Sequence, residues 1–232
     1  MEEIKGFYIE NGVLYEYAGE KRILIIPNGV TAIAKRAFEG NKHIEKVVLP
    51  ESVTRIELYA FSGCVNLKNI NFPDNLKRIG SHAFSYCKSL MDITIPTGTV
   101  LIEERAFSHC SNLEKLTFEE GIQSLKIEEE AFTHCDNLKS IIWTNKVSEI
   151  EDGAFSYCKS IRCVNIPDSI IKINSYTFYQ CALLESVIIP DSVQTICANA
   201  FKNCIYIKSV HIPTNCVYAK ESFPLECKVI RY

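Results

Sequence analysis

The chain has 232 residues, of which 47% are apolar and 23% are charged, and its formal net charge is −3. This balance is typical of a globular protein and excludes a disordered chain. Because the net charge is small and no run of Lys or Arg occurs, the sequence carries no electrostatic footprint for nucleic acid or for an anionic membrane. No segment stays apolar over the roughly 20 residues that a membrane-spanning helix needs, so we expect no membrane insertion.

Residues 1–22 come before the regular part of the chain. Phe7–Ile9 and Val13–Tyr15 are two short β-rich segments on either side of Asn11-Gly12, a dipeptide typical of tight hairpin turns. We predict an N-terminal capping hairpin here, because a stack of repeated units needs its exposed end covered. The first residues are acidic and do not form a secretory signal. We therefore expect a cytoplasmic protein if Met1 is the natural start, and an extracellular or cell-surface protein if the sequence is trimmed.

Residues 23–232 repeat at a nearly fixed period. A period of this length is typical of a solenoid, in which one unit stacks on its copies because it cannot bury its own apolar face. We predict a single domain overall, a solenoid of about nine copies whose atypical last copy is the C-terminal cap. The anchor phenylalanines follow one another at intervals of 23, 23, 23, 25, 23, 23, 23 and 22 residues: Phe38, Phe61, Phe84, Phe107, Phe132, Phe155, Phe178, Phe201 and Phe223.

Each copy has two halves of different pattern. In the first half Ile, Ala-Phe, Cys and Leu follow one another at spacings of three to five residues, which predicts a short helical or 3₁₀ segment. The second half alternates, as in Ile93-Thr94-Ile95, and ends at a proline, which predicts one very short strand per copy. The copies therefore predict an α/β fold with parallel strands on one face and helical or 3₁₀ segments on the other.

The repeat I-x3-A-F-x2-C-x2-L-x2-I-x-I-P, seen in Ile79–Pro96, resembles the BspA-like (treponemal-type) leucine-rich repeat family over roughly residues 24–227. The resemblance implies a right-handed, curved leucine-rich-repeat solenoid used for protein binding, frequently on bacterial or protist surfaces. The family has no shared catalytic residues to assign to this chain. We therefore expect a protein that is not an enzyme and binds no cofactor.

Seven of the 11 cysteines occupy one column of the repeat, three residues after the phenylalanine. They are interpreted as buried, reduced thiols that act as small apolar residues. A disulfide framework is the alternative, but such frameworks are typical of small secreted domains without a core. The column comprises Cys64, Cys87, Cys110, Cys135, Cys158, Cys181 and Cys204.

The strand residues that alternate with the core positions predict a solvent-exposed sheet face. Charges of both signs alternate there with apolar side chains, which favours a protein partner of unknown identity over a small anion, and we expect a monomer. The alternative is a plain solvated face on a passive adhesion or spacer segment. The candidate partner-binding residues are Glu45, Lys68, Met91, Glu114, Lys139, Arg162, Asn71, Thr94, Thr117, Ile142 and Asn165.

His109-Cys110 and His134-Cys135 occupy equivalent places in adjacent copies and give the alternative function, a metal- or redox-linked binding protein. Zinc needs converging ligands, and the cysteine column continues where no histidine is present. A Cys-His nucleophile also needs a third orienting group. No phosphate loop or hydrolase motif occurs.

Two further departures from the repeat are candidates for function. Two extra residues lie between Phe107 and Phe132, in an acidic stretch over Glu119–Glu130. We expect this stretch to bulge from the solenoid, as a tolerated loop insertion or as an acidic edge that contacts a partner. Trp143 is the only tryptophan; its repeat column is apolar, which predicts a core position, with a binding hot spot as the alternative.

Overall fold

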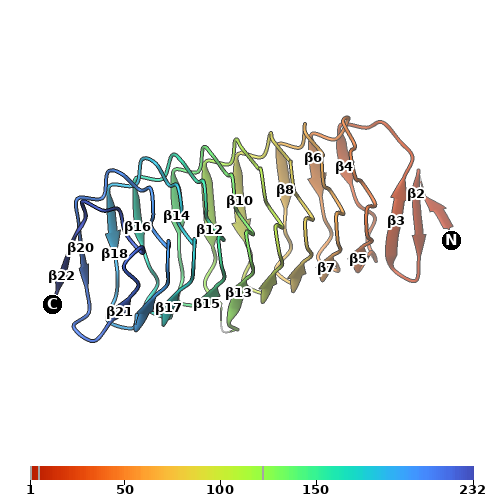
Figure 1. Cartoon of the computed structure of the whole chain (residues 1–232). Helices are drawn as coiled ribbons and strands as arrows, with labels where there is room; N and C mark the ends of the chain where they lie inside the picture. The colour runs from red at the N-terminus through yellow and green to blue at the C-terminus, as the bar shows by residue number, and fades with distance from the viewer. Residues whose placement is uncertain (1, 5, 122) are drawn as a thin grey trace.

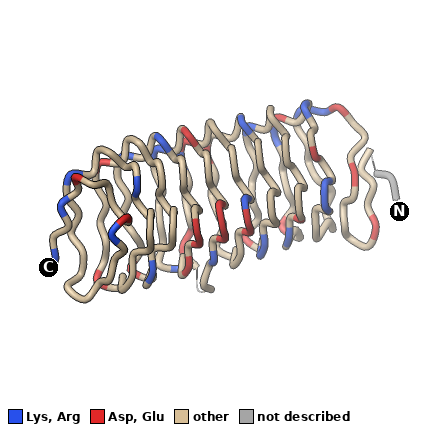
Figure 2. Tube along the Cα trace, viewed as in Figure 1, with Lys and Arg blue, Asp and Glu red and all other residues tan. Residues whose placement is uncertain are grey.

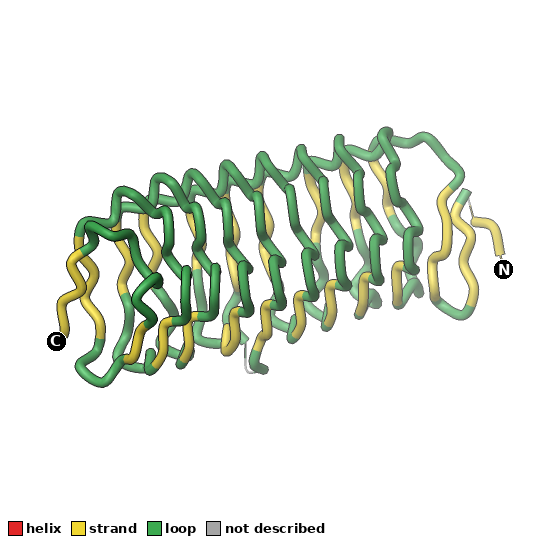
Figure 3. Tube along the Cα trace, viewed as in Figure 1, coloured by secondary structure: helices red, strands yellow, loops and turns green. Residues whose placement is uncertain are grey.

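The computed structural model describes residues 2–4, 6–121 and 123–232. These residues form an elongated stack of coils, with the two ends of the chain at opposite ends of the stack (Figure 1). They contain 22 β-strands and no helix (Figure 3). The prediction of parallel strands in a solenoid is confirmed, and the prediction of helical or 3₁₀ segments, and with it the α/β class, is wrong.

Three antiparallel strands begin the chain: β1 (Glu2–Ile4), β2 (Phe7–Glu10) and β3 (Val13–Tyr17). The β2–β3 turn contains Asn11 and Gly12, both with positive φ, as a primed hairpin turn requires. Strand β3 then pairs in parallel with the first coil. The Phe7 and Tyr17 rings lie 4.7 Å apart, and Tyr17 lies 6.2 Å from Phe38, so the hairpin continues the aromatic core of the coils.

Two strands occur in each coil, where the sequence predicted one. The first strand row holds the predicted strands: β4 (Ile23–Ile25), β6 (Lys46–Val48), β8 (Asn69–Asn71), β10 (Asp92–Ile95), β12 (Lys115–Phe118), β14 (Ser140–Ile142), β16 (Cys163–Asn165), β18 (Ser186–Ile188), β20 (Ser209–Ile212) and β22 (Lys228–Arg231). The second strand row holds β5 (Ala32–Ile33), β7 (Arg55–Ile56), β9 (Arg78–Ile79), β11 (Leu101–Ile102), β13 (Leu125–Ile127), β15 (Val147–Ile150), β17 (Lys172–Ile173), β19 (Thr195–Ile196) and β21 (Val217–Tyr218).

A β-turn separates the two strands of a coil. Most of these turns begin at the repeat proline, whose carbonyl accepts a hydrogen bond from the third residue after it, as in Val53 N to Pro50 O at 3.1 Å. Thr144 replaces proline in one coil and accepts the same bond from Val147. Most strands of the second row have only two residues, which is too short for an alternating pattern to show in the sequence.

The segment that carries Ala-Phe and Cys consists of consecutive β-turns, here called the turn row. In one coil the amides of Ala60, Ser62 and Cys64 bind carbonyls three residues back. The amides between them point to the next coil, as in Phe61 N to Ala83 O at 2.7 Å and Gly63 N to Ser85 O at 2.7 Å. Because every second amide leaves its own coil, the segment cannot close the regular i→i+3 series of a 3₁₀-helix.

Residues in the left-handed backbone conformation, with positive φ, produce these consecutive turns. Two residues with positive φ, four apart, recur in each complete copy of the turn row, as at Tyr59 (φ 57°) and Gly63 (φ 71°) or at His82 (φ 54°) and Tyr86 (φ 60°). A positive φ at the third position is what a type II turn demands, and it is excluded from a right-handed helix. The apolar residues that recur every three or four positions in this segment are therefore spaced by consecutive turns, and not by a helix.

Two columns of the turn row run through the core, beside aliphatic side chains from both strand rows. The anchor phenylalanines from Phe61 to Phe201 are fully buried, and consecutive rings from Phe38 to Phe223 stack with centroids 4.7–5.6 Å apart. The seven cysteines of the predicted column are free, buried thiols. Both columns lie inside the coils, so each coil covers the apolar face of its neighbour.

The two extra residues lie between Phe118, which pairs with Ile95, and Lys126, which pairs with Leu101. The pairing of β13 with β15 also shifts register between Leu125 and Lys126. Lys146 is only 5% exposed, and its Nζ donates to the carbonyl of Pro96, two coils away, at 2.7 Å. Burial lowers the pKa of Lys146. Gly121 permits close packing here, since a Cβ at that position would lie 2.7 Å from the backbone oxygen of Thr97 and 3.3 Å from Lys146 Cδ.

Candidate functional site

The candidate partner-binding residues all lie on or beside the first strand row and are exposed or half-buried. Thr94, Thr117 and Ile142 are direct neighbours on adjacent strands. Glu45 and Arg162, at the ends of the set, are separated by five coil-to-coil steps, which is about 24 Å at the usual strand spacing. The residues therefore form an extended strip along the sheet face, and not one compact site.

Charged residues at the start of these strands pair with one another along the stack. Arg22 Nη1 and Lys68 Nζ lie 3.1 Å and 2.9 Å from the carboxylate of Glu45, and the hydrogen bond from Lys68 lowers the pKa of Glu45. Lys139 Nζ lies 2.8 Å from Glu114, and Arg162 pairs with Glu185. This column is nearly neutral, and its pairs are exposed and individually weak.

The ladder of the first strand row is interrupted twice. Among the described strands, β8 does not pair with β10 and β14 does not pair with β16. The middle residues of β8 and β14, Ile70 and Ile141, are half-buried, whereas the middle residues of the other strands are buried in the core for most of the row. Each of these two strands is followed by a large half-buried aromatic ring, Phe72 or Trp143, which packs edge-on against a core phenylalanine.

A groove of about 490 Å³ lies at the second interruption. It is lined by the ends of β14, β16 and β18, including Ile142, Trp143, Thr144, Asn165 and Ile188. The Trp143 ring is stacked on Phe118 at 5.3 Å, so it is part of the core packing while its edge borders the groove. The indole Nε1 of Trp143 and the hydroxyl of Thr144 are buried without a hydrogen-bond partner.

The turn row carries an aromatic stack on its outer side that the sequence reasoning did not find. The rings of Tyr86, His109, His134 and Tyr157 stack in succession with centroids 4.5, 4.5 and 4.2 Å apart. All four residues have positive φ and immediately precede a column cysteine. The recurrence of Tyr and His at this position in four consecutive copies was the available signal, but it reads as ordinary surface variation.

Burial of the imidazoles lowers the pKa of His109 and of His134, and the positive charge of His134 adds to the effect at His109. The neighbouring cysteines face the other way: the thiols of Cys110 and Cys135 are inside the core and donate to the carbonyls of Phe84 and Phe107. The His-Cys pairs therefore do not converge. In the part of the chain that the structure describes, no three His, Cys, Asp or Glu side chains are placed to hold a metal ion.

Acidic residues gather on the middle coils of the stack (Figure 2). Burial, together with the charges of Glu130, Glu104 and Asp152, raises the pKa of Glu129. Glu130 is also paired with Arg105 at 2.6 Å, and its amide donates to Asp152. The residues of the acidic stretch from Glu128 onward thus belong to the regular turn row and do not bulge. Ile122, within the rest of the predicted bulge, lies outside the described residues.

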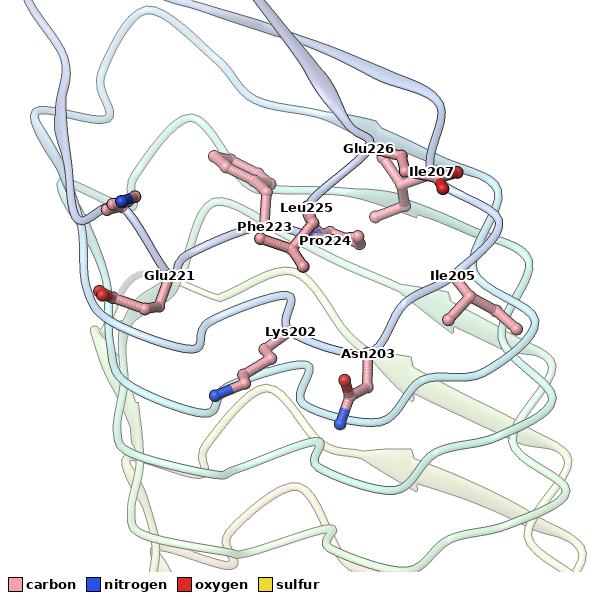
Figure 4. A pocket seen from close by; sticks show the side chains of 10 residues that line it. Lys202, Asn203, Ile205, Ile207, Glu221, Phe223, Pro224, Leu225 and Glu226 are labelled. Carbon is pink, nitrogen blue, oxygen red and sulfur yellow. The ribbon is translucent and has the colours of Figure 1, made fainter.

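A second hollow, of about 610 Å³, lies at the C-terminal coil. Figure 4 shows it with Leu225 near the centre of the view, Glu221 and Lys202 toward one side and Ile205 on the other. Leu225 is fully exposed and Ile205 is 60% exposed. Cationic and anionic side chains line it together with apolar ones, so no single ligand charge is favoured.

Comparison with known proteins identifies the repeat family and the fold. A family model described as a BspA type leucine rich repeat region, in six copies, matches residues 8–126 and 125–231. No curated protein matches the chain significantly. The described residues contain no helix that is long and apolar enough to cross a membrane.

Two solved structures share the fold. A leucine-rich repeat protein from Bacteroides ovatus is 23% identical, with a TM-score of 0.66, over 92% of this chain and 66% of that one. A leucine rich cell surface protein from Faecalibacterium prausnitzii is 24% identical, with a TM-score of 0.72, over 97% of this chain and 74% of that one. The chain thus spans just under two thirds of the first protein and about three quarters of the second.

Proposed function

Since the chain belongs to the BspA type leucine-rich repeat family, we propose that it is a protein-interaction module that binds a protein partner through its sheet face. The family is generally non-catalytic, and the module needs no catalytic group to act. Binding uses the first strand row as a preformed surface.

The observation that carries the proposal is a set of exposed aliphatic side chains along that row. Ile25 is 70% exposed, Met91 51%, Ile142 46% and Ile188 62%. Exposed apolar side chains bordered by polar ones are typical of protein-binding surfaces. They project from strands that are held by parallel ladders and by the phenylalanine core, so little conformational entropy is lost when a partner binds.

Affinity capture from a lysate of the source organism, followed by mass spectrometry, tests the proposal. The comparison bait carries Glu45→Lys, Lys68→Glu, Glu114→Lys and Arg162→Glu, which change the charged column and leave the core untouched. We expect a partner that wild type retains and the folded variant loses. Equal capture by both baits places binding elsewhere, at the acidic edge, and capture of nothing by either bait favours a passive spacer.

The cellular location is a separate proposal. We propose the cytoplasm, with the cell surface as the alternative. Fractionation of the source organism, with an antibody against the chain, distinguishes the two.

A further inference from the structure

The boundary after β14 and β15 differs from every other coil boundary that the structure describes. The first strand row is broken there between β14 and β16, and the second strand row is broken there between β15 and β17. At the other interruption, after β8, the second row continues from β9 to β11. Backbone pairing is thus missing on both strand rows at this one boundary, beside the groove at the ends of β14, β16 and β18.

Polar groups at the groove have no hydrogen-bond partner among the described residues: two of them are buried just beneath its surface and one is exposed. An asparagine closes the equivalent position four coils earlier: Asn71 accepts from the Leu49 amide at 2.8 Å and donates to the Leu49 carbonyl at 3.1 Å, as a backbone would. Asn165 occupies the same repeat position relative to Trp143, but its side chain makes no hydrogen bond to the described residues. Trp143 Nε1 and Thr144 Oγ1, the latter on a residue only 7% exposed, are also unpartnered.

Unpartnered groups of this kind define the chemistry of a ligand. The indole Nε1–H can only donate, whereas the Thr144 hydroxyl and the Asn165 amide can both donate and accept. A buried group without a partner costs about 1–3 kcal/mol, and a ligand that supplies the bond recovers that free energy. A backbone peptide group offers one acceptor and one donor, which matches this set.

The other residues that line the groove limit the kinds of ligand that it can bind. Ile142 and Ile188 expose aliphatic surface on either side of β16, and the groove contains no Lys or Arg and one carboxylate, that of Asp168. An anionic ligand such as a phosphate therefore finds no counter-charge.

We propose that the groove at the ends of β14, β16 and β18 binds an extended peptide segment of a partner protein, with an aliphatic side chain between Ile142 and Ile188. The peptide backbone completes the hydrogen bonds of Asn165 and, after a small shift of the ring edge, those of Trp143 and Thr144. This inference rests on the proposed function. It identifies the groove as the main contact between the sheet face and the partner.

A random ten-residue peptide library displayed on phage, selected against the full chain, supplies the probe. Trp143 is the only tryptophan, so its emission reports the groove directly when the selected peptides lack tryptophan. Ile188→Glu and Ile142→Glu introduce a charge at exposed positions that bear on the ligand and not on the core. Ile171→Glu is the matched control, because Ile171 is an isoleucine that is 57% exposed but lies outside the first strand row and does not line the groove.

We expect selected peptides to share an aliphatic residue and to change Trp143 emission on binding. We also expect their affinity to fall at least tenfold with Ile188→Glu and with Ile142→Glu but not with Ile171→Glu. Thermal unfolding of the three variants verifies that they fold alike. The proposal is overturned if no peptide is enriched, if Trp143 emission is unchanged on binding, or if all three variants bind equally.

Lysate capture separates this inference from the proposed function. A partner that is lost on charge reversal of the sheet face, yet retained by Ile188→Glu, leaves the sheet-face function standing and rejects the groove. Loss of the partner by both variants supports the two together.

Discussion

The Sγ of Cys110 lies 3.2 Å from the carbonyl oxygen of Phe84, the anchor phenylalanine of the preceding coil. The same carbonyl also accepts the backbone amide of Cys87, its own neighbour in the turn row, at 3.1 Å. The other six column cysteines repeat the contact at 3.1–3.4 Å. Cysteine suits this column because it is small and apolar and still offers a weak donor to a buried carbonyl.

These thiols should be chemically inert in the folded protein. Burial raises the pKa of Cys64 and of Cys110 to about 12, so neither forms the thiolate that reacts. We expect an aromatic disulfide reagent at pH 8 to modify the exposed Cys163 first and all 11 cysteines only after denaturation. Cys163→Ser is the control and should remove the fast phase. Column thiols that react as fast as Cys163 contradict the buried ladder.

Loss of one phenylalanine of the core should be costly. Phe107→Ala removes a fully buried ring that is stacked on both sides, at 5.1 Å from Phe84 and 5.1 Å from Phe132. We expect the free energy of unfolding to fall by about 3–5 kcal/mol, measured by urea denaturation. Phe72→Ala, which removes a half-buried ring beside the same core, is the matched variant and should cost less. Equal decreases in the free energy of unfolding for the two variants would contradict the expectation that the stacked core ring contributes more.

The stacked imidazoles should make stability depend on pH. Burial lowers the pKa of His109 and His134 in the folded protein, so between that lowered pKa and about 6.5 the unfolded chain binds more protons than the folded one. Stability should therefore be fully present above about pH 6.5 and decline below it. Nearby Asp136 and Glu130 oppose the shift, whereas Lys88 acts with it at His109 and Lys159 at His134.

The double variant His109→Phe, His134→Phe tests this dependence, because the rings can still stack but no longer titrate. The midpoint of thermal unfolding, followed from pH 7.5 to pH 5, should decline less steeply in the variant than in wild type. Parallel pH profiles for the two proteins mean that the decline comes from other groups.

Close approach of neighbouring coils should make one glycine difficult to replace. A Cβ on Gly98 would lie 2.0 Å from the backbone oxygen of Asp74, well inside contact distance. We expect Gly98→Ala to destabilise the fold by about 1–3 kcal/mol, because the obstacle is backbone that cannot rotate away. Asn75→Ala, at the same repeat position one coil earlier, removes one exposed hydrogen bond to Glu51 and should cost less. Urea denaturation of both variants checks the order.

The sequence predicted what depends on spacing along the chain. The period of the phenylalanines and the alternation in segments such as Ile93–Ile95 placed the core columns and the exposed strip correctly. The turn row was misread because an apolar residue every three or four positions fits both a 3₁₀-helix and consecutive turns. The difference is the positive φ of residues such as His109 and Tyr157, which are not glycines and give no sign of it in the sequence.

The candidate groove was beyond the sequence for a different reason. Ile142 and Asn165 were identified as exposed, but the interruption beside them is a property of hydrogen bonds between strands 23 residues apart. Asn71 and Asn165 occupy the same column and look alike in the repeat, yet only Asn71 closes onto the preceding coil. The stack of Tyr86 and His109 is likewise formed between coils.

The double interruption between β14–β15 and β16–β17 also has a mechanical consequence. Across it the turn row stays continuous, through bonds such as Phe155 N to Thr177 O at 2.9 Å and Tyr157 N to Tyr179 O at 2.7 Å. The Phe155 and Phe178 rings have the widest spacing of the described stack, 5.6 Å. Bending the molecule toward its turn side at this point opens the strand side without breaking a backbone ladder. On the strand side, this boundary is crossed by side-chain hydrogen bonds, from Ser169 Oγ to Val147 O at 2.6 Å and from Asn174 Nδ2 to Ile150 O at 2.8 Å. Bending here should therefore widen the groove at a lower cost than bending at a boundary held by backbone ladders.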